Sequence, residues 1–104
     1  MDITELIKIC HTQAKEKGFW DEQRNVAELL MLIVTEISEA CEALRKGDPS
    51  DNHIPQFSNF SVELADAVIR IFDLCGSMNI DLEEVITAKL AFNMTRKKKH
   101  GKRF

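Results

Sequence analysis

Glu36-Ile37-Ser38-Glu39 and Glu63-Leu64-Ala65-Asp66 are the two stretches around which the chain is organised. Each stretch places two carboxylates three residues apart, and residues at this spacing are neighbours on one face of an α-helix. Each stretch can therefore present two carboxylates to the same point. Two such pairs, brought together, form a donor set for a metal ion.

A concentrated turn signal separates the two pairs. Gly47-Asp48-Pro49-Ser50-Asp51-Asn52 predicts that the first helix ends near Lys46, with Gly47 in the left-handed conformation that closes many helices. A new helix should begin near Ser58 or Asn59, both of which are good N-cap residues. The sequence therefore predicts a helical hairpin with one pair of carboxylates on each arm.

The helical rise brings the two pairs to nearly the same height. At ~1.5 Å per residue, Glu39 lies about 10 Å before the turn and Glu63 about 7 Å after it. Four converging carboxylates would repel one another, and some would be forced to take up protons. A divalent cation that prefers oxygen ligands removes this conflict, and Mg²⁺ suits it best. We therefore predict that Glu36, Glu39, Glu63 and Asp66 are metal ligands.

The third helix also allows a simpler interpretation. Glu63, Asp66, Arg70 and Asp73 fall within one stripe, and almost every other residue from Phe60 to Cys75 is apolar. An isolated helix with this pattern would carry an ordinary solvent face, with salt bridges from Arg70 to Asp66 and Asp73. The matching pair on the preceding helix favours the metal site over this alternative.

Composition predicts one all-α domain. The chain has 104 residues, 44% of them hydrophobic, with four Gly, two Pro and no Tyr, which favours helices over a β-rich fold. Hydrophobic spacing and capping signals predict four helices. They span residues 2–17, 23–46, 59–78 and 82 to 96 or beyond. The domain covers residues 1–97, and residues 98–104 form a basic tail.

Several classes of protein are disfavoured by the sequence. The longest purely apolar run, Leu29 to Val34, is too short to cross a membrane, and no signal peptide is evident, so we expect a cytoplasmic protein. Cys10, Cys41 and Cys75 are odd in number and lack C-x-x-C spacing, so they are expected to be reduced core residues rather than zinc ligands.

Charge is distributed unevenly along the chain. Residues 89–104 contain seven of the 14 basic residues and none of the 17 acidic ones, so residues 1–88 carry seven bases against 17 acids and a net charge of −10. The basic end is either a solvated terminus or a phosphate-binding arm. A contact with nucleic acid is the weakest interpretation, because the basic run from Arg96 to Arg103 has no interleaved aromatic residue and only Phe104 follows it.

Three further features have alternative roles. Lys89, Asn93 and Arg96 share one face of the fourth helix, where they would bind phosphate oxygens or serve solubility alone. Trp20 is favoured as a core residue at a helix junction, and the alternative is a wall that stacks on a nucleobase. The middle of the second helix, from Leu29 to Val34, is apolar on nearly every side, which predicts a helix enclosed by several neighbours.

Together these residues resemble the MazG-like nucleotide pyrophosphohydrolases of the all-α NTP pyrophosphatase superfamily, in the short single-domain branch. The paired E-x-x-E and E-x-x-D motifs carry the resemblance, together with Gly18-Phe19-Trp20, the run Leu32-Ile33-Val34-Thr35, Arg45-Lys46-Gly47, and Lys89, Asn93 and Arg96 with His100-Gly101-Lys102 behind them. It covers nearly the whole chain. The best-known member has two tandem modules, whereas this chain has one.

The resemblance implies a Mg²⁺-dependent enzyme, with Mn²⁺ as a substitute, that cleaves (d)NTP to (d)NMP and pyrophosphate. It implies a four-helix bundle completed as a homodimer or homotetramer. By position, Glu36, Glu39, Glu63 and Asp66 would bind the metal, and Lys89, Asn93 and Arg96 the substrate. Glu36 or Glu39 would activate water, and Trp20 is the candidate for the base pocket.

Other functions fit the same sequence. Within the branch, dCTP-like or modified nucleotides are possible substrates for nucleotide-pool house-cleaning, and the carboxylates do not choose a base. A related phosphohydrolase, such as a phosphoribosyl-ATP pyrophosphohydrolase, would bind its metal in the same way but act on another substrate. A non-catalytic helical oligomerisation or interaction module is the alternative from a different class, and it predicts neither Mg²⁺ nor nucleotide binding.

Overall fold

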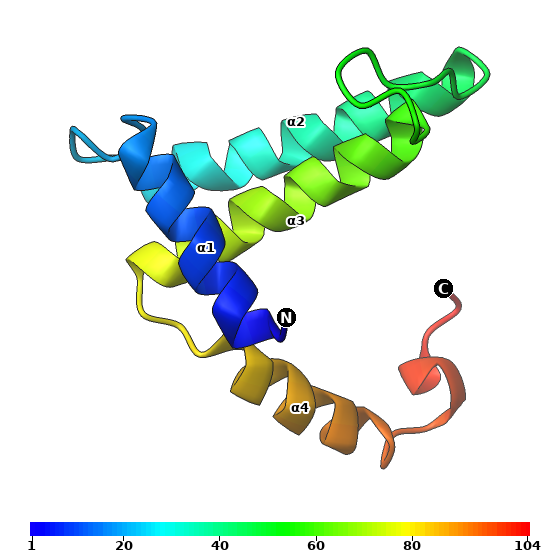
Figure 1. Cartoon of the computed structure of the whole chain (residues 1–104). Helices are drawn as coiled ribbons and strands as arrows, with labels where there is room; N and C mark the ends of the chain where they lie inside the picture. Colours follow the sequence, from blue (N-terminus) through cyan, green and yellow to red (C-terminus); the bar gives the residue numbers. More distant parts are fainter.

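The computed structural model describes all residues, 1–104, and it is entirely helical. Four α-helices follow one another: α1 (Ile3–Glu16), α2 (Val26–Arg45), α3 (Asn59–Ser77) and α4 (Leu82–Asn93). A short 3₁₀ helix, η1 (Lys98–Gly101), lies in the basic tail. No strand forms, and the only β-type pairing is an isolated bridge between Ser50 and Ser58. The prediction of an all-α fold is confirmed (Figure 1).

Polar residues begin each helix as the sequence indicates, with one exception. Asp2, Ser58 and Asp81 cap α1, α3 and α4 through their side chains. The helix predicted from Gln23 begins only at Val26, because the Asn25 side chain accepts hydrogen bonds from the next backbone N–H groups and caps α2 there.

Three of the four helices end where the sequence predicts, and α4 does not. Gly18, Gly47 and Asn79 have positive φ angles and follow the ends of α1, α2 and α3, the conformation expected after a helix. The fourth helix, predicted to reach Arg96 or beyond, ends at Asn93. The remaining basic residues are therefore in turns and η1 rather than on the helical face.

Helices α2 and α3 lie side by side and run in opposite directions, forming the predicted hairpin (Figure 1). The loop between them is held by acidic side chains. Asp48 Oδ1 accepts a hydrogen bond from the backbone N–H of Phe60 at 2.9 Å. Asp51 is buried and accepts from the N–H groups of His53 and Ile54. The loop is thus an ordered connection fixed to the start of α3.

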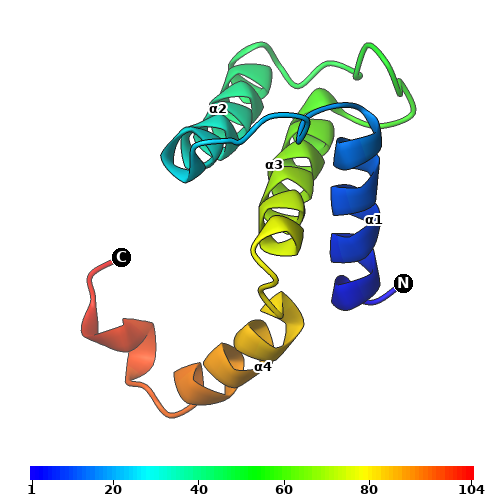
Figure 2. The same ribbon diagram turned by 90° about the vertical axis from the view of Figure 1, so that its left-hand side faces the viewer.

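Helix α1 packs against α3, and a glycine allows the close approach (Figure 2). A Cβ atom built on Gly76 would lie 2.6 Å from the Cβ of His11, a distance that real Cβ atoms do not adopt. Helix α1 therefore crosses α3 where α3 has no side chain. This contact also sets His11 beside Asp73.

Helix α4 does not complete a bundle within the chain. It packs on α1, where Glu83 accepts from the backbone N–H of Ile3 at 3.1 Å, and then extends away from the other helices (Figures 1 and 2). None of its residues is buried. The radius of gyration is 16.2 Å, whereas a compact domain of this length has about 13 Å. The chain on its own is an open arrangement of helices.

One long side of α2 stays uncovered, so the prediction of a helix enclosed on every side is wrong for the single chain. Exposed apolar side chains follow one another at helical spacing along this helix. They are Val26, Leu30, Val34, Ile37 and Leu44. Exposed Leu64, Val68 and Ile71 form a similar row on α3.

The three cysteines agree only in part with the prediction of reduced core residues. All three cysteines are free thiols, as expected. Cys75 is buried and Cys10 is partly buried, but Cys41 is exposed on α2 and is not a core residue.

None of the helices combines the length and apolar content needed to cross a lipid bilayer.

Candidate metal centre

Three of the four predicted ligands meet between α2 and α3. One carboxylate oxygen from each of Glu36, Glu39 and Glu63 lies within 4.8 Å of the other two. Glu36 is buried, Glu63 is partly buried and Glu39 is exposed. Asp66, the fourth predicted ligand, is outside this group of three, but it lines the same cavity as Glu36. The hairpin thus brings the two sequence motifs together.

Arg70 neutralises one of these carboxylates. Its Nε atom lies 2.9 Å from Glu36 Oε1, across the interface between α3 and α2. Burial opposes ionisation of Glu36, but the hydrogen bonds from Arg70 and from the neighbouring carboxyl groups outweigh it and lower the pKa of Glu36. The intrahelical pairs from Arg70 to Asp66 and Asp73 do not form. The simpler interpretation, a solvent-exposed face held by salt bridges within α3, is therefore wrong for Arg70.

Glu63 is the most perturbed carboxyl group of the site. Burial, together with the adjacent Glu39 and Glu36, raises the pKa of Glu63 to about 7. Its Oε1 accepts a hydrogen bond from Asn59, while its Oε2 is buried and has no hydrogen-bond partner. A buried oxygen without a partner is costly unless a proton or a cation satisfies it.

Asn59 and Asp51 belong to this site, although the sequence pattern indicates only a capping role for Asn59 and a loop position for Asp51. The Nδ2 atom of Asn59 donates to Glu63 Oε1 and to Asp51 Oδ1, each at 3.2 Å. The N–H groups of Ile54 and His53 hold the pKa of Asp51 below its ordinary value. Asp51 is therefore a fixed anion that orients Asn59, and Asn59 in turn orients Glu63. The spacing of four between Asn59 and Glu63 was the available sequence signal.

The pKa of Asp66 is shifted in the same direction as that of Glu63. Burial and the nearby carboxylates of Glu36 and Asp51 raise the pKa of Asp66, with Arg70 opposing the shift. The site contains more carboxyl groups than the single guanidinium of Arg70 can compensate. These acids therefore hinder one another's ionisation.

The donor set suits a hard divalent cation. Mg²⁺ prefers oxygen ligands at ~2.1 Å and binds through a few carboxylates, with water and substrate oxygens filling the other positions. Three carboxylate oxygens within 4.8 Å of one another, one of them exposed, agree with such an open site. The buried Glu63 Oε2 without a partner is the atom that a cation would satisfy.

The residues predicted to contact phosphate lie on α4, or just beyond its end in the case of Arg96, and apart from the carboxylates. The Lys89 Nζ atom lies 4.9 Å from the centre of the Phe92 ring and the Arg96 Cζ atom lies 5.7 Å from it. Both cations thus lie near Phe92, but Arg96 follows the end of α4, so the predicted common face of one helix does not extend to it. Asn93, the last residue of α4, has a buried Oδ1 without a partner. Helix α4 extends away from the α2–α3 hairpin, so these residues do not meet the carboxylates of their own chain (Figure 1).

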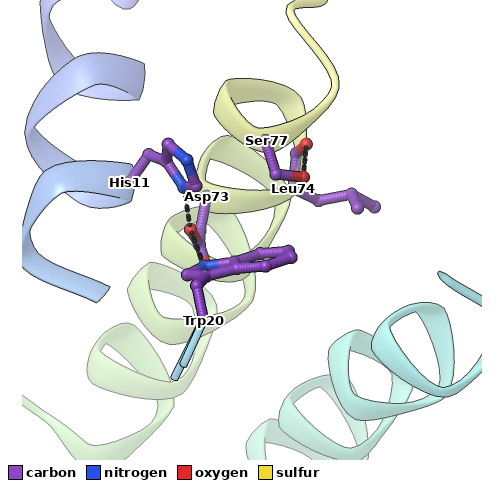
Figure 3. A network of polar contacts seen from close by, with 5 residues as sticks. All are labelled: His11, Trp20, Asp73, Leu74 and Ser77. Atoms are coloured by element: carbon purple, nitrogen blue, oxygen red, sulfur yellow. Dashed lines mark hydrogen bonds and ion pairs between the residues drawn. The ribbon is translucent and has the colours of Figure 1, made fainter. Parts of the chain in front are cut away.

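Trp20 lies in a polar network at the junction of α1 and α3 (Figure 3). Its Nε1 donates to Asp73 Oδ1 at 2.9 Å, and His11 Nδ1 lies 2.8 Å from the same oxygen. The rings of His11 and Trp20 meet edge to face, with centroids 5.4 Å apart. This arrangement agrees with the interpretation of Trp20 as a junction residue, and Trp20 does not line the cavity beside Glu36 and Asp66.

No family model matches this chain, and comparison with the curated proteins and with the solved structures gives no significant match. The assignment of a family and of a function therefore rests on the residues and their geometry.

Proposed function

We propose that the protein is a MazG-like, Mg²⁺-dependent nucleoside triphosphate pyrophosphohydrolase. It cleaves a ribo- or deoxyribonucleoside triphosphate to the monophosphate and pyrophosphate, in the cytoplasm, and serves to clear nucleotides from the pool. The observation that carries the proposal is the convergence of Glu36, Glu39 and Glu63, with one buried oxygen of Glu63 left without a partner. The two sequence motifs that the family shares supply these residues, and Asp66 completes them.

In this reaction, water attacks the α-phosphorus, the bond from that phosphorus to the bridging oxygen breaks, and pyrophosphate leaves. Mg²⁺, with Mn²⁺ as a substitute, supplies charge neutralisation and acidifies water when it is bound. Glu36, Glu39, Glu63 and Asp66 are the residues that would hold it. The chain's own contribution is to fix these carboxylates, through Arg70 on Glu36 and Asn59 on Glu63.

Glu39 is the better candidate for the group that takes the proton from water. It is exposed and forms no ion pair, whereas Glu36 is buried and held by Arg70. A general base must reach the proton that it abstracts, and a carboxylate already bound to a guanidinium is a weaker base. Glu36 remains the alternative base that the motif supplies.

We also propose that the active protein is a homodimer or homotetramer. The exposed apolar rows on α2 and α3 are the kind of surface that marks contacts between proteins. Assembly also offers a route for Lys89, Asn93 and Arg96 to contact phosphates, because α4 points away from the carboxylates of its own chain. One chain would then complete the site of another.

The decisive experiment is to measure pyrophosphate release from a panel of ribo- and deoxyribonucleoside triphosphates, with Mg²⁺ and with EDTA. The panel includes dCTP, modified nucleotides and phosphoribosyl-ATP, so it ranks substrates and separates the related phosphohydrolase. Metal-dependent release is the expected result. Glu39→Gln and Asp66→Asn should lose at least about 100-fold in turnover while they keep their helical content.

The same panel separates the enzyme from a non-catalytic interaction module. Absence of pyrophosphate release from every substrate, together with a melting temperature that Mg²⁺ does not change, would favour the module. Glu42→Gln is the matched control, because Glu42 lies on α2 but pairs with Arg45 and Lys46 in solvent. This variant should retain full turnover.

A further inference from the structure

A cavity of about 460 Å³ adjoins the carboxylate site and extends from it toward the C-terminal end of α1. Glu36, Asp66 and Arg70 line the part formed by α2 and α3. Gln13, Lys17, Phe19 and Arg24 line the part formed by α1 and the segment after it. The volume falls within the range of ~300–1,000 Å³ that small-molecule sites occupy.

The part of the cavity away from the carboxylates has an aromatic wall. Phe19 lines it and is 58% exposed, while Ile69, which is 45% exposed, and Asp73 line the cavity from α3. Exposed apolar side chains that line a cavity next to a polar site are typical of a surface that receives a flat ring.

Two cations complete this wall. The Arg24 guanidinium carbon lies 5.8 Å from the centre of the Phe19 ring and 5.1 Å from the Trp20 ring. Neither Arg24 nor Lys17 forms an ion pair. Trp20 thus supports Arg24 from outside the cavity, and its own position is fixed by Asp73. Arg24 and Lys17 are free to bind acceptor atoms of a ligand.

We propose that this cavity is the nucleoside subsite, with Phe19 rather than Trp20 as the residue against which the base lies. The inference rests on the proposed function and adds an orientation to it. The phosphates belong at the carboxylate end, where a cation would bind them, and the uncharged planar ring belongs at the aromatic end. Gln13, Lys17 and Arg24 then offer hydrogen-bond donors to the oxygen and nitrogen acceptors of the base or sugar.

Binding of nucleoside monophosphates in the presence of Mg²⁺ tests the subsite without catalysis, because a monophosphate is the product of the proposed reaction. The probes are AMP, GMP, CMP and dTMP, and the signal is the fluorescence of Trp20, the only tryptophan, whose ring lies against Arg24. At least one monophosphate at millimolar concentration should change this fluorescence. Phe19→Ala should weaken that binding by about 5- to 100-fold, the usual value of stacking on an aromatic side chain.

A second variant and a control guard against a folding artefact. Ala14→Met places a larger side chain into the cavity from α1, keeps a good helix former and should also abolish binding. Phe57→Ala removes a similarly exposed phenylalanine from the loop between α2 and α3 and should bind like the wild type. Circular dichroism would test whether each variant keeps its helical content.

The outcomes separate this inference from the proposed function. Metal-dependent pyrophosphate release without any effect of Phe19→Ala or Ala14→Met on binding or KM overturns the subsite and leaves the enzyme. A wild type that binds no monophosphate overturns the subsite as well. Monophosphate binding that both variants lose, in a protein that releases no pyrophosphate from any substrate, supports the subsite and refutes the proposed reaction.

Discussion

Arg70 Nε lies 2.9 Å from Glu36 Oε1, so the single arginine of α3 reaches across to α2 instead of pairing along its own helix. The contact joins the first carboxylate motif to α3, the helix that carries the second motif. It also compensates one negative charge of the site, and it leaves Glu39, Glu63 and Asp66 without a cation of their own. The stability of the metal-free site therefore depends on Arg70.

Replacing Arg70 with Gln should destabilise the metal-free protein more than the metal-bound one. Loss of the guanidinium leaves Glu36 buried without a partner, at a cost of about 1–3 kcal/mol, below the value for a fully buried pair because Arg70 is partly exposed. A bound cation replaces part of the lost charge. Melting temperatures of Arg70→Gln and wild type, with EDTA and with Mg²⁺, measure the difference.

Arg45→Gln is the control for this experiment, since Arg45 pairs with Glu42 on the exposed side of α2. An exposed pair of this kind contributes ~0–1 kcal/mol, so the control should melt close to the wild type in both conditions. If Arg70→Gln lowers the melting temperature equally with EDTA and with Mg²⁺, the Arg70 guanidinium and the bound Mg²⁺ do not compensate the same carboxylates.

Glu63 should make the stability of the metal-free protein depend on pH. Its pKa is raised from 4.5 to about 7, so the folded chain holds a proton in this window that the unfolded chain has released. Stability from this group is therefore complete below about pH 4.5 and is lost as the pH rises through 7. Melting in EDTA from about pH 5 to about pH 8 should show this decline, and Glu63→Gln should flatten it.

The same ionisation should couple to metal binding. A cation binds the deprotonated carboxylate, so Mg²⁺ affinity should rise as the pH increases toward 7 and above, with release of a proton. Calorimetric titration in buffers of different ionisation enthalpy measures that proton. Binding that is independent of pH in the wild type would exclude Glu63 as a ligand.

Asn59→Ala should weaken metal binding without removing a ligand. Asn59 Nδ2 links Glu63 Oε1 to Asp51 Oδ1, and residues that orient metal ligands typically contribute 10- to 100-fold in affinity. Binding of Mn²⁺, followed by electron paramagnetic resonance, gives the affinity directly. Asn52→Ala, which changes an exposed amide of the same loop, should bind Mn²⁺ like the wild type.

An Asn59→Ala protein with unchanged Mn²⁺ affinity but a lower melting temperature would show that Asn59 only stabilises the loop. Asn59→Gln provides a further distinction, because it keeps the amide but moves it by one methylene group. Partial recovery of affinity in Asn59→Gln relative to Asn59→Ala is expected if the amide itself orients Glu63.

The convergence of the carboxylates could be predicted because it depends on local signals. The turn at Gly47, the cap at Ser58 and the count of residues on either side fix the register of the hairpin. Once α2 and α3 are antiparallel neighbours, Glu36 and Glu63 must approach one another. The sequence therefore determines most of the site at the level of single helices and one loop.

The partner of Arg70 and the position of α4 could not be predicted in this way. Both Asp66 and Asp73 lie at favourable spacing from Arg70 on α3, and the choice of Glu36 instead depends on how the two helices are rotated. The apolar residues of α4, such as Val85 and Leu90, show only that this helix has an apolar face. They do not show whether that face is covered by the same chain or by another.

The apolar row on α2 leads to the last prediction, which concerns assembly. Leu30 and Val34 are four residues apart, and both are exposed on a face of α2 different from that of Glu36. A charge at each position would be buried without a partner in an assembled protein, which is strongly unfavourable. The double variant Leu30→Glu, Val34→Glu should therefore be monomeric, whereas the proposed state of the wild type is a dimer or tetramer.

Size-exclusion chromatography with light scattering measures the mass of each variant, and Thr35→Glu is the matched control because Thr35 is exposed beside Val34 but outside the apolar row. The control should keep the wild-type mass. If α4 of one chain serves the site of another, the monomeric double variant should also lose pyrophosphate release while it still binds Mg²⁺ through its own carboxylates. A wild type that is already monomeric and fully active would refute both the assembly and the sharing of residues between chains.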